Sequence, residues 1–212
     1  MKFLAFGDTH GSVEAHEILL QKALEEKPDI MCCIGDFTIF GMETDKFLAD
    51  LNNITLKTKT KLLMIPGNHE STAKLKAEVK KYSNIIWLHK DTYTFKGFTF
   101  IGYGGGGFSE HDDEFVEFVN KLEETPLPIL LTHQPPKNTT LDEVWEDHHV
   151  GNQDFREYIE LAQPIIALSG HIHETFGIQD LIEDSLLLNP GPLGQLIEIP
   201  QENEDEKKQR NK

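Results

Sequence analysis

The chain has few cysteines, few arginines and no apolar run long enough to cross a bilayer. Its two cysteines, Cys32 and Cys33, are adjacent, so on a strand their side chains point to opposite faces and cannot pair. Neither belongs to a cysteine-based zinc pattern, so we expect buried thiols. The apolar run at residues 1–6 is too short for a signal peptide. Together these absences favour a cytoplasmic protein with no membrane segment.

Basic residues are also scarce. The 212 residues include 36 acidic and 20 basic side chains, which gives a formal net charge of −16. Between Glu110 and Glu160 fourteen acidic side chains face only three basic ones. The chain therefore lacks the basic stripe of a protein that follows a nucleic-acid backbone, and nucleic acid is not expected as a partner. A solubility or high-salt adaptation explains the acidic surface equally well.

Short apolar strands alternate with amphipathic helices, a pattern typical of an α/β domain with a buried parallel sheet. The spacing predicts strands over 2–6, 30–34, 61–65, near Trp87, and over 92–95, 98–101, 129–132, 165–169, 174–179, 185–189 and 195–199, and helices over 12–25, 43–53, 71–81, 112–122 and 152–161. Lys96-Gly97 is predicted to be a tight hairpin turn. We expect one domain over residues 1–200 with two sheets, followed by a charged, disordered tail over 201–212.

Metal-binding side chains follow five of the predicted strands. They comprise two aspartates, one asparagine and five histidines: Asp8, His10, Asp36, Asn68, His69, His133, His171 and His173. Ligands of open α/β sheets collect outside the carboxyl ends of the strands, so we expect these side chains to meet there. Carboxylate, amide and imidazole donors suit a pair of divalent first-row metals. The alternative, polar loop residues with no joint role, would require the same coincidence at five strand ends.

In this order, Asp8-x-His10, Gly35-Asp36, Gly67-Asn68-His69-Glu70, His133 and Gly170-His171-x-His173 resemble the motifs of the calcineurin-like metallophosphoesterase superfamily. The likeness is strongest to a small single-domain microbial subgroup of phosphoesterases and phosphodiesterases. The resemblance covers the chain from Met1 to about Ile199. It implies a four-layer α-β-β-α sandwich, in which two mixed sheets face each other and the active site lies at the carboxyl ends of the strands.

The resemblance also implies two divalent metal ions. Asp8, His10 and His173 would hold the first, Asn68, His133 and His171 would hold the second, and Asp36 would bridge them. Manganese, iron, nickel, cobalt and zinc all suit these donors, with manganese favoured. The expected reaction is hydrolysis of a small phosphate ester by a hydroxide shared between the metals.

Asp36 and His69 would be the catalytic residues. His69 would protonate or stabilise the departing oxygen. In the protein-phosphatase branch an aspartate orients this histidine, but Ile39 stands at that position here, which leaves a purely structural His69 as the alternative. Phe40 and Pro66 occupy the places of two arginines that grip a dianionic monoester in that branch.

Arginine is scarce throughout, since the chain contains only Arg156 and Arg210. A phosphodiester carries one charge and needs less cationic contact, so we expect a phosphodiesterase. A phosphomonoesterase with the same metal site and a catalytically weak protein-interaction scaffold are the alternatives, and a nuclease is a third, weakened by the missing basic track. The substrate-binding residues and the oligomeric state are unknown from sequence.

For most of the other conspicuous residues we expect structural roles. The run Gly102–Gly107 lacks the ending of a P-loop and is expected to be a tightly turning connection near the site, with a backbone N–H contact to a phosphate as the alternative. Asp147, His148 and His149 are expected to have no ligand role. Phe108 and Trp145 are open to two interpretations, stacking on a base or an aromatic leaving group and core packing.

Overall fold

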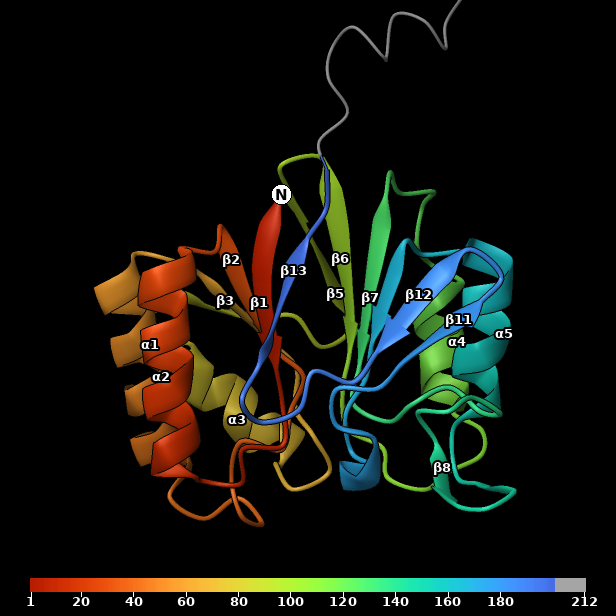
Figure 1. The fold of residues 1–212 in the computed structure, drawn as a ribbon, viewed down its shortest axis with the longest axis horizontal. Coiled ribbons are helices and arrows are strands. Elements are labelled where there is room, and N and C mark those ends of the chain that lie inside the picture. The colour runs from red at the N-terminus through yellow and green to blue at the C-terminus, as the bar shows by residue number, and fades with distance from the viewer. Residues whose placement is uncertain (201–212) are drawn as a thin grey trace, which may run out of the picture.

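Two β-sheets face each other, and helices cover the outer side of each, in the computed structural model, which describes residues 1–200 (Figure 1). The predicted tail over 201–212 lies outside the described residues. The four layers confirm the predicted α-β-β-α sandwich with two mixed sheets.

The first sheet has five strands in the order β13-β1-β2-β3-β4. They are β13 (Gln195–Glu198), β1 (Lys2–Phe6), β2 (Ile30–Cys33), β3 (Leu62–Met64) and β4 (Ile85–Trp87). Strands β1 to β4 pair in parallel, and β13 joins β1 antiparallel. The outer face is covered by α1 (Val13–Glu26), α2 (Thr44–Thr58) and α3 (Thr72–Val79).

The second sheet has six strands in the order β11-β12-β10-β7-β6-β5. They are β11 (Gln179–Ile182), β12 (Ser185–Leu188), β10 (Ile166–Leu168), β7 (Pro128–Thr132), β6 (Phe98–Tyr103) and β5 (Asp91–Phe95). The four central strands are parallel, whereas β5 and β11 are antiparallel edges. Helices α4 (Asp113–Val119) and α5 (Gln153–Ala162) cover its outer face.

The layers follow from the alternation of side chains along buried strands. In β1, Phe3 and Ala5 pack between the sheets, whereas Leu4 and Phe6 pack against the helices. The same alternation sends Cys32 into the inter-sheet core and Cys33 to the helical side. Both thiols are buried and free, as predicted.

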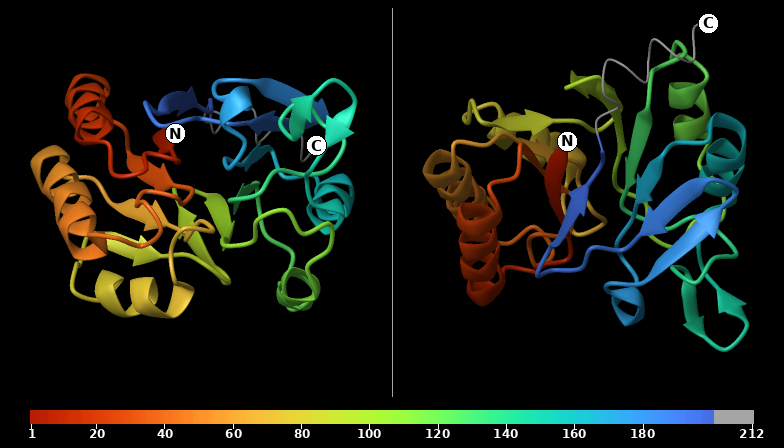
Figure 2. Two further views of the ribbon diagram at one scale, coloured as in Figure 1. Left: turned by 90° about the horizontal axis from the view of Figure 1, so that it is seen from below. Right: turned by 45° about the horizontal axis from the view of Figure 1, so that its top comes forward.

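The parallel strands of both sheets end at the same edge of the sandwich, at the bottom of Figure 1. Figure 2 (left) looks onto this edge, where the loops that follow the strands of the two sheets come together. The predicted hairpin is confirmed, because β5 and β6 pair across Lys96 and Gly97, both of which have positive φ. No helix within residues 1–200 has the length and hydropathy needed to span a membrane.

The predicted strand over 174–179 is wrong. Residues His173–Thr175 form a 3-10 helix, η1, and the next strand, β11, begins only at Gln179. Side-chain hydrogen bonds fix this turn: the Thr175 hydroxyl donates to the Ile172 carbonyl at 2.9 Å, and the Asn189 amide donates to the same carbonyl at 3.0 Å. These polar contacts therefore outweigh the β propensity of the segment. The turn places His173 at the edge where the strands end.

A small hairpin between β7 and α5 has no counterpart in the predicted elements. It pairs β8 (Glu143–Trp145) with β9 (His148–His149) and projects from the same edge (Figure 1). The predicted helix over 43–53 also extends further, to Thr58, because Phe47, Leu51 and Ile54 continue its buried face.

Candidate metal centre

All eight candidate side chains lie at this one edge, seven of them on loops and His173 at the start of η1. Three groups have donor atoms within 4.8 Å of one another: Asp8, His10 and His173; His10, Asp36 and His69; and Asp36, His133 and His171. The first group contains the residues predicted to hold the first metal. The third contains the predicted bridge and two of the residues predicted to hold the second metal.

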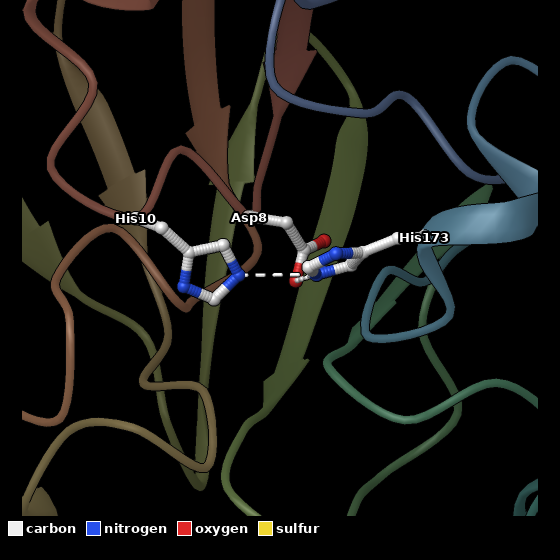
Figure 3. A group of neighbouring side chains, drawn as sticks. All are labelled: Asp8, His10 and His173. Carbon is white, nitrogen blue, oxygen red and sulfur yellow. Dashed lines mark hydrogen bonds and ion pairs between the residues drawn. The ribbon is translucent and has the colours of Figure 1, made fainter.

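The first group joins the loop after β1 to the loop after β10 (Figure 3). The Nε2 atoms of His10 and His173 point at each other, 3.0 Å apart, and Asp8 Oδ1 lies 3.9 Å from His173 Nε2. The Asp8 carboxylate also accepts the backbone N–H of His171 at 3.1 Å. A carboxylate and two imidazoles thus converge on one point.

The third group is more deeply buried than the first, because both Asp36 and His133 are buried. His133 Nε2 lies 2.9 Å from Asn68 Oδ1 and 3.4 Å from Asp36 Oδ2. The His171 ring lies 5.2 Å from the His133 ring, and its Nε2 atom is buried without a hydrogen-bond partner within residues 1–200. Buried polar atoms are nearly always paired, so an unpaired imidazole nitrogen facing these donors fits a metal ligand.

The histidines are oriented in two different ways. The ring Nδ1 atoms of His10 and His133 lie 3.3 Å and 2.9 Å from the backbone carbonyls of Thr38 and Ile34. A carbonyl can only accept, so each Nδ1 carries a hydrogen and the neutral ring offers a lone pair at Nε2, as a metal ligand requires.

His69 has the opposite arrangement. Its Nδ1 accepts the backbone N–H of Phe40 at 3.3 Å, so the hydrogen of the neutral ring lies on Nε2, which is 3.8 Å from Asp36 Oδ2. The Phe40 ring also stacks on the His69 ring at 4.3 Å. Phe40 therefore orients the His69 ring, although Ile39 stands where an aspartate orients this histidine in the protein-phosphatase branch. In this arrangement the neutral His69 ring presents an N–H at Nε2 to the space beside Asp36.

Strained backbone also occurs at four of the candidate residues. Asp8, His10, Asp36 and His171 all have positive φ, of 54°, 43°, 50° and 70°. Such conformations cost L-residues of order 1 kcal/mol each and persist where surrounding contacts enforce them. Here the Asp8 and His10 amides donate to the carbonyls of Gly35 and Asp36, both at 3.0 Å, which ties the loop after β1 to the loop after β2.

Glu70 joins two of the loops, a role that sequence reasoning did not assign to it. Its buried carboxylate accepts the N–H groups of Asp36 and Gly67, both at 2.9 Å, and the N–H and hydroxyl of Thr38 at 3.0 Å and 2.6 Å. In the sequence, its position directly after His69 in the Gly67-Asn68-His69-Glu70 motif is the feature that could have indicated this role. The carboxylate holds the loop after β2 against the loop after β3, and so fixes Asp36.

Two glycines allow the carboxylates to approach the backbone. A Cβ atom on Gly67 would lie 1.9 Å from Asp36 Oδ1, and one on Gly170 would lie 2.3 Å from Asp8 Oδ2. Side chains at these positions would displace the candidate ligands.

The buried charges perturb one another strongly. Burial raises the pKa of Asp8 to about 6. At Asp36 burial acts in the same sense, but the hydrogen bond and charge of His133 outweigh it and lower the pKa of Asp36 to about 2. Burial opposes protonation of His133, yet Asp36 raises the pKa of this ring to about 9. Burial lowers the pKa of His171 to about 4. Without a cation, His133 therefore holds a proton next to Asp36 at neutral pH.

Other singled-out residues lie outside the cluster. Arg156 is engaged by the Asn138 carbonyl at 2.8 Å and by Glu160. His149 donates to the buried Asp142 carboxylate at 2.8 Å, in keeping with a structural role. The N–H group of Gly104 donates to His89 Nδ1, and that of Gly105 donates to the Pro66 carbonyl, which agrees with a tight connection near the site.

Comparison with known proteins agrees with this geometry. The model of the calcineurin-like phosphoesterase family matches residues 1–175, and the chain belongs to this family of phosphate-ester hydrolases. A UPF0046 protein of Caenorhabditis elegans, K07C11.7, is 25% identical over 201 residues. That alignment covers 84% of this chain but only 65% of the nematode protein, so the chain spans less than two thirds of that relative.

Two solved structures share the fold. TT1561 of Thermus thermophilus superimposes with a TM-score of 0.71 at 16% identity, covering 91% of this chain and 89% of its own. A dimetal phosphatase from Danio rerio gives a TM-score of 0.60 at 9% identity, covering 91% and 88%. At these identities the likeness concerns the fold.

Proposed function

We propose that this protein hydrolyses a small phosphodiester at a centre of two divalent metal ions. The observation that carries the proposal is the convergence of seven donor side chains on one edge, where Asp36 is grouped with His10 on one side and with His133 and His171 on the other. The seven are Asp8, His10, Asp36, Asn68, His133, His171 and His173. The dimetal phosphatase with the same fold supports a two-metal reading.

The donor set fits the metals on chemical grounds. Two carboxylates, an amide oxygen and four imidazoles suit manganese, iron, cobalt, nickel or zinc, of which we favour manganese. The unpaired Nε2 of His171 and the carbonyl-oriented rings of His10 and His133 supply lone pairs toward the centre. When bound, such ions lower the pKa of a coordinated water and neutralise charge that develops on phosphoryl oxygens.

The chain's own residues supply orientation and a hydrogen-bond donor. Asp36 lies between the two donor groups, held by Glu70 and by the His69 amide, which donates to its Oδ1 at 2.9 Å. His69 directs its Nε2 hydrogen toward the same space. In the proposed hydrolysis a bond forms between phosphorus and the oxygen of water while the bond to the leaving oxygen breaks. His69 donates a hydrogen bond from Nε2 to that leaving oxygen, which then takes up the proton that the attacking water has lost.

The shortage of arginine favours a diester over a monoester. Arg156 is committed to the backbone around Asn138, and Lys74 is the cationic residue lining the hollow of about 240 Å³ beside His69. A site with little cationic contact beyond the metals binds a singly charged ester more readily than a dianion. The acidic segment between Glu110 and Glu160 also weighs against nucleic acid. We therefore propose that the substrate is a small molecule and that the protein acts in the cytoplasm.

The test combines metal content with turnover. We expect purified protein reconstituted with manganese to bind two equivalents and to hydrolyse bis(p-nitrophenyl) phosphate faster than p-nitrophenyl phosphate. Asp36→Ala should lose at least a hundredfold in kcat/KM. A metal-replete parent without turnover, matched by Asp36→Ala, would favour the protein-interaction scaffold. A preference for the monoester would favour the phosphomonoesterase.

A further inference from the structure

A second hollow opens on the other side of the candidate metal centre. Its volume is about 490 Å³, and it is lined by Phe108, Val144, Trp145, Val150, His171, Ile172, His173 and Glu174. It shares no residue with the hollow beside His69. His10 contacts the rings of both His69 and His173, so the candidate metal centre lies between the two hollows.

The two largest side chains of this second hollow are exposed. Phe108 is 68% exposed and Trp145 is 65% exposed, so neither belongs to the core, and the core-packing interpretation of these residues is wrong. Phe108 leans on the His171 ring at 4.5 Å, and Trp145 lies flat against His148 at 4.1 Å with an angle of 2° between the rings. Large aromatic surfaces left open beside a polar site indicate a place for an apolar group.

The hairpin that carries Trp145 is anchored at its base. The fully buried carboxylate of Asp142 accepts the backbone N–H groups of Asn138, Thr139 and Gly151 at 3.1 Å, 2.7 Å and 2.9 Å. It also accepts the Thr139 hydroxyl and the His149 ring. The base of the hairpin is therefore held in place, which lowers the entropic cost of binding a rigid ligand against Trp145.

The charges around the hollow limit what it accepts. Glu174 lines it directly, and the hairpin carries Glu143, Glu146 and Asp147. A second phosphate or a carboxylate would be repelled, whereas an uncharged planar ring could stack on Trp145 or Phe108.

We propose that this hollow, named here the aromatic subsite (Phe108, Val144, Trp145 and Val150), binds an uncharged planar aromatic substituent of the phosphodiester. The inference rests on the proposed function, because His69 assigns the leaving group to its own side of the centre. The substituent that stays on phosphorus then extends past His171 and His173 into the aromatic subsite. A nucleobase or an aryl ring has the required chemistry.

The experiment compares two diesters that release the same p-nitrophenolate. Phenyl p-nitrophenyl phosphate keeps an aromatic arm, whereas methyl p-nitrophenyl phosphate keeps a methyl group. The manganese-loaded protein should prefer the phenyl diester about tenfold in kcat/KM, a magnitude within the range of aromatic stacking. Trp145→Ala should reduce that ratio to about twofold or less, whereas Trp145→Phe should preserve most of it. Leu161→Ala removes an 86% exposed side chain on α5 and should leave the ratio unchanged.

A binding measurement separates this inference from the proposed function. Phenylphosphonate should bind the manganese-loaded protein about tenfold more tightly than methylphosphonate in calorimetry, and Trp145→Ala should abolish the difference. Hydrolysis of both diesters with no dependence on the arm, or an equal loss on both in Trp145→Ala, would overturn the aromatic subsite and leave the hydrolase standing. Arm-dependent phosphonate binding without turnover would support the subsite and overturn the proposed function.

Discussion

Glu70→Gln tests how the site is held together. The Glu70 carboxylate accepts four hydrogen bonds, two at each oxygen, from Asp36, Gly67 and Thr38. Glutamine keeps one acceptor oxygen and places an NH2 group against two donors. Hydrogen bonds to charged groups contribute about 1.5–3 kcal/mol each, so losing two costs about 3 kcal/mol at the lower end of that range. We expect the lower end of that range because the substitution also removes a charge that is costly to bury.

Urea unfolding of the metal-free protein measures this cost, and a manganese titration measures its effect on the site. We expect the free energy of unfolding to fall by about 3 kcal/mol and manganese affinity to fall about 10–100-fold, as for other groups that orient metal ligands. Glu117→Gln removes the same charge from a 74% exposed side chain on α4 and should cost under about 1 kcal/mol. If the two variants unfold alike and bind manganese like the parent, Glu70 does not hold the loops.

Three further changes probe other parts of the centre. Gly67→Ala should displace Asp36 and abolish binding of the second manganese equivalent, measured by elemental analysis, whereas Gly107→Ala adds a methyl group in open space and should be neutral. His69→Ala should slow diesters with poor leaving groups about 10²–10³-fold and p-nitrophenyl esters much less, and an equal loss across a leaving-group series would contradict a hydrogen bond to the leaving oxygen. The pKa of His133 is raised to about 9, and a metal must displace its proton, so manganese affinity should rise with pH from about 6 to 9. Calorimetry at pH 7.5 in buffers of different ionisation enthalpy should detect about one proton released, and a value of zero would contradict this protonation state.

Much of the fold could be predicted because the strands are buried on both faces. Continuous apolar runs such as those ending at Phe6 and Cys33 are read directly from the sequence, and parallel pairing places their ends together. The turn at His173–Thr175 could not be predicted, because it depends on contacts with Asn189, which is distant in sequence. The hairpin that carries Trp145 was missed for a similar reason: its strands are short and its base depends on the buried Asp142.

The candidate site could likewise be predicted only in part. The type and order of the donors are properties of the sequence, and the structure brings all of them to one edge. What orients them is mostly backbone, and the sequence does not show which carbonyl or amide a ring will meet. The Phe40 amide that sets the tautomer of His69 is one example. The carbonyls of Thr38 and Ile34 that set His10 and His133 are others.

The most direct test is a crystal structure of the manganese-loaded protein with anomalous scattering data. We expect two anomalous peaks, one contacted by Asp8, His10 and His173 and the other by Asn68, His133 and His171, with Asp36 contacting both. His69 should contact neither ion. A single peak, a peak at another place, or His69 bound to an ion through Nε2 would contradict a two-metal centre in which His69 is the donor.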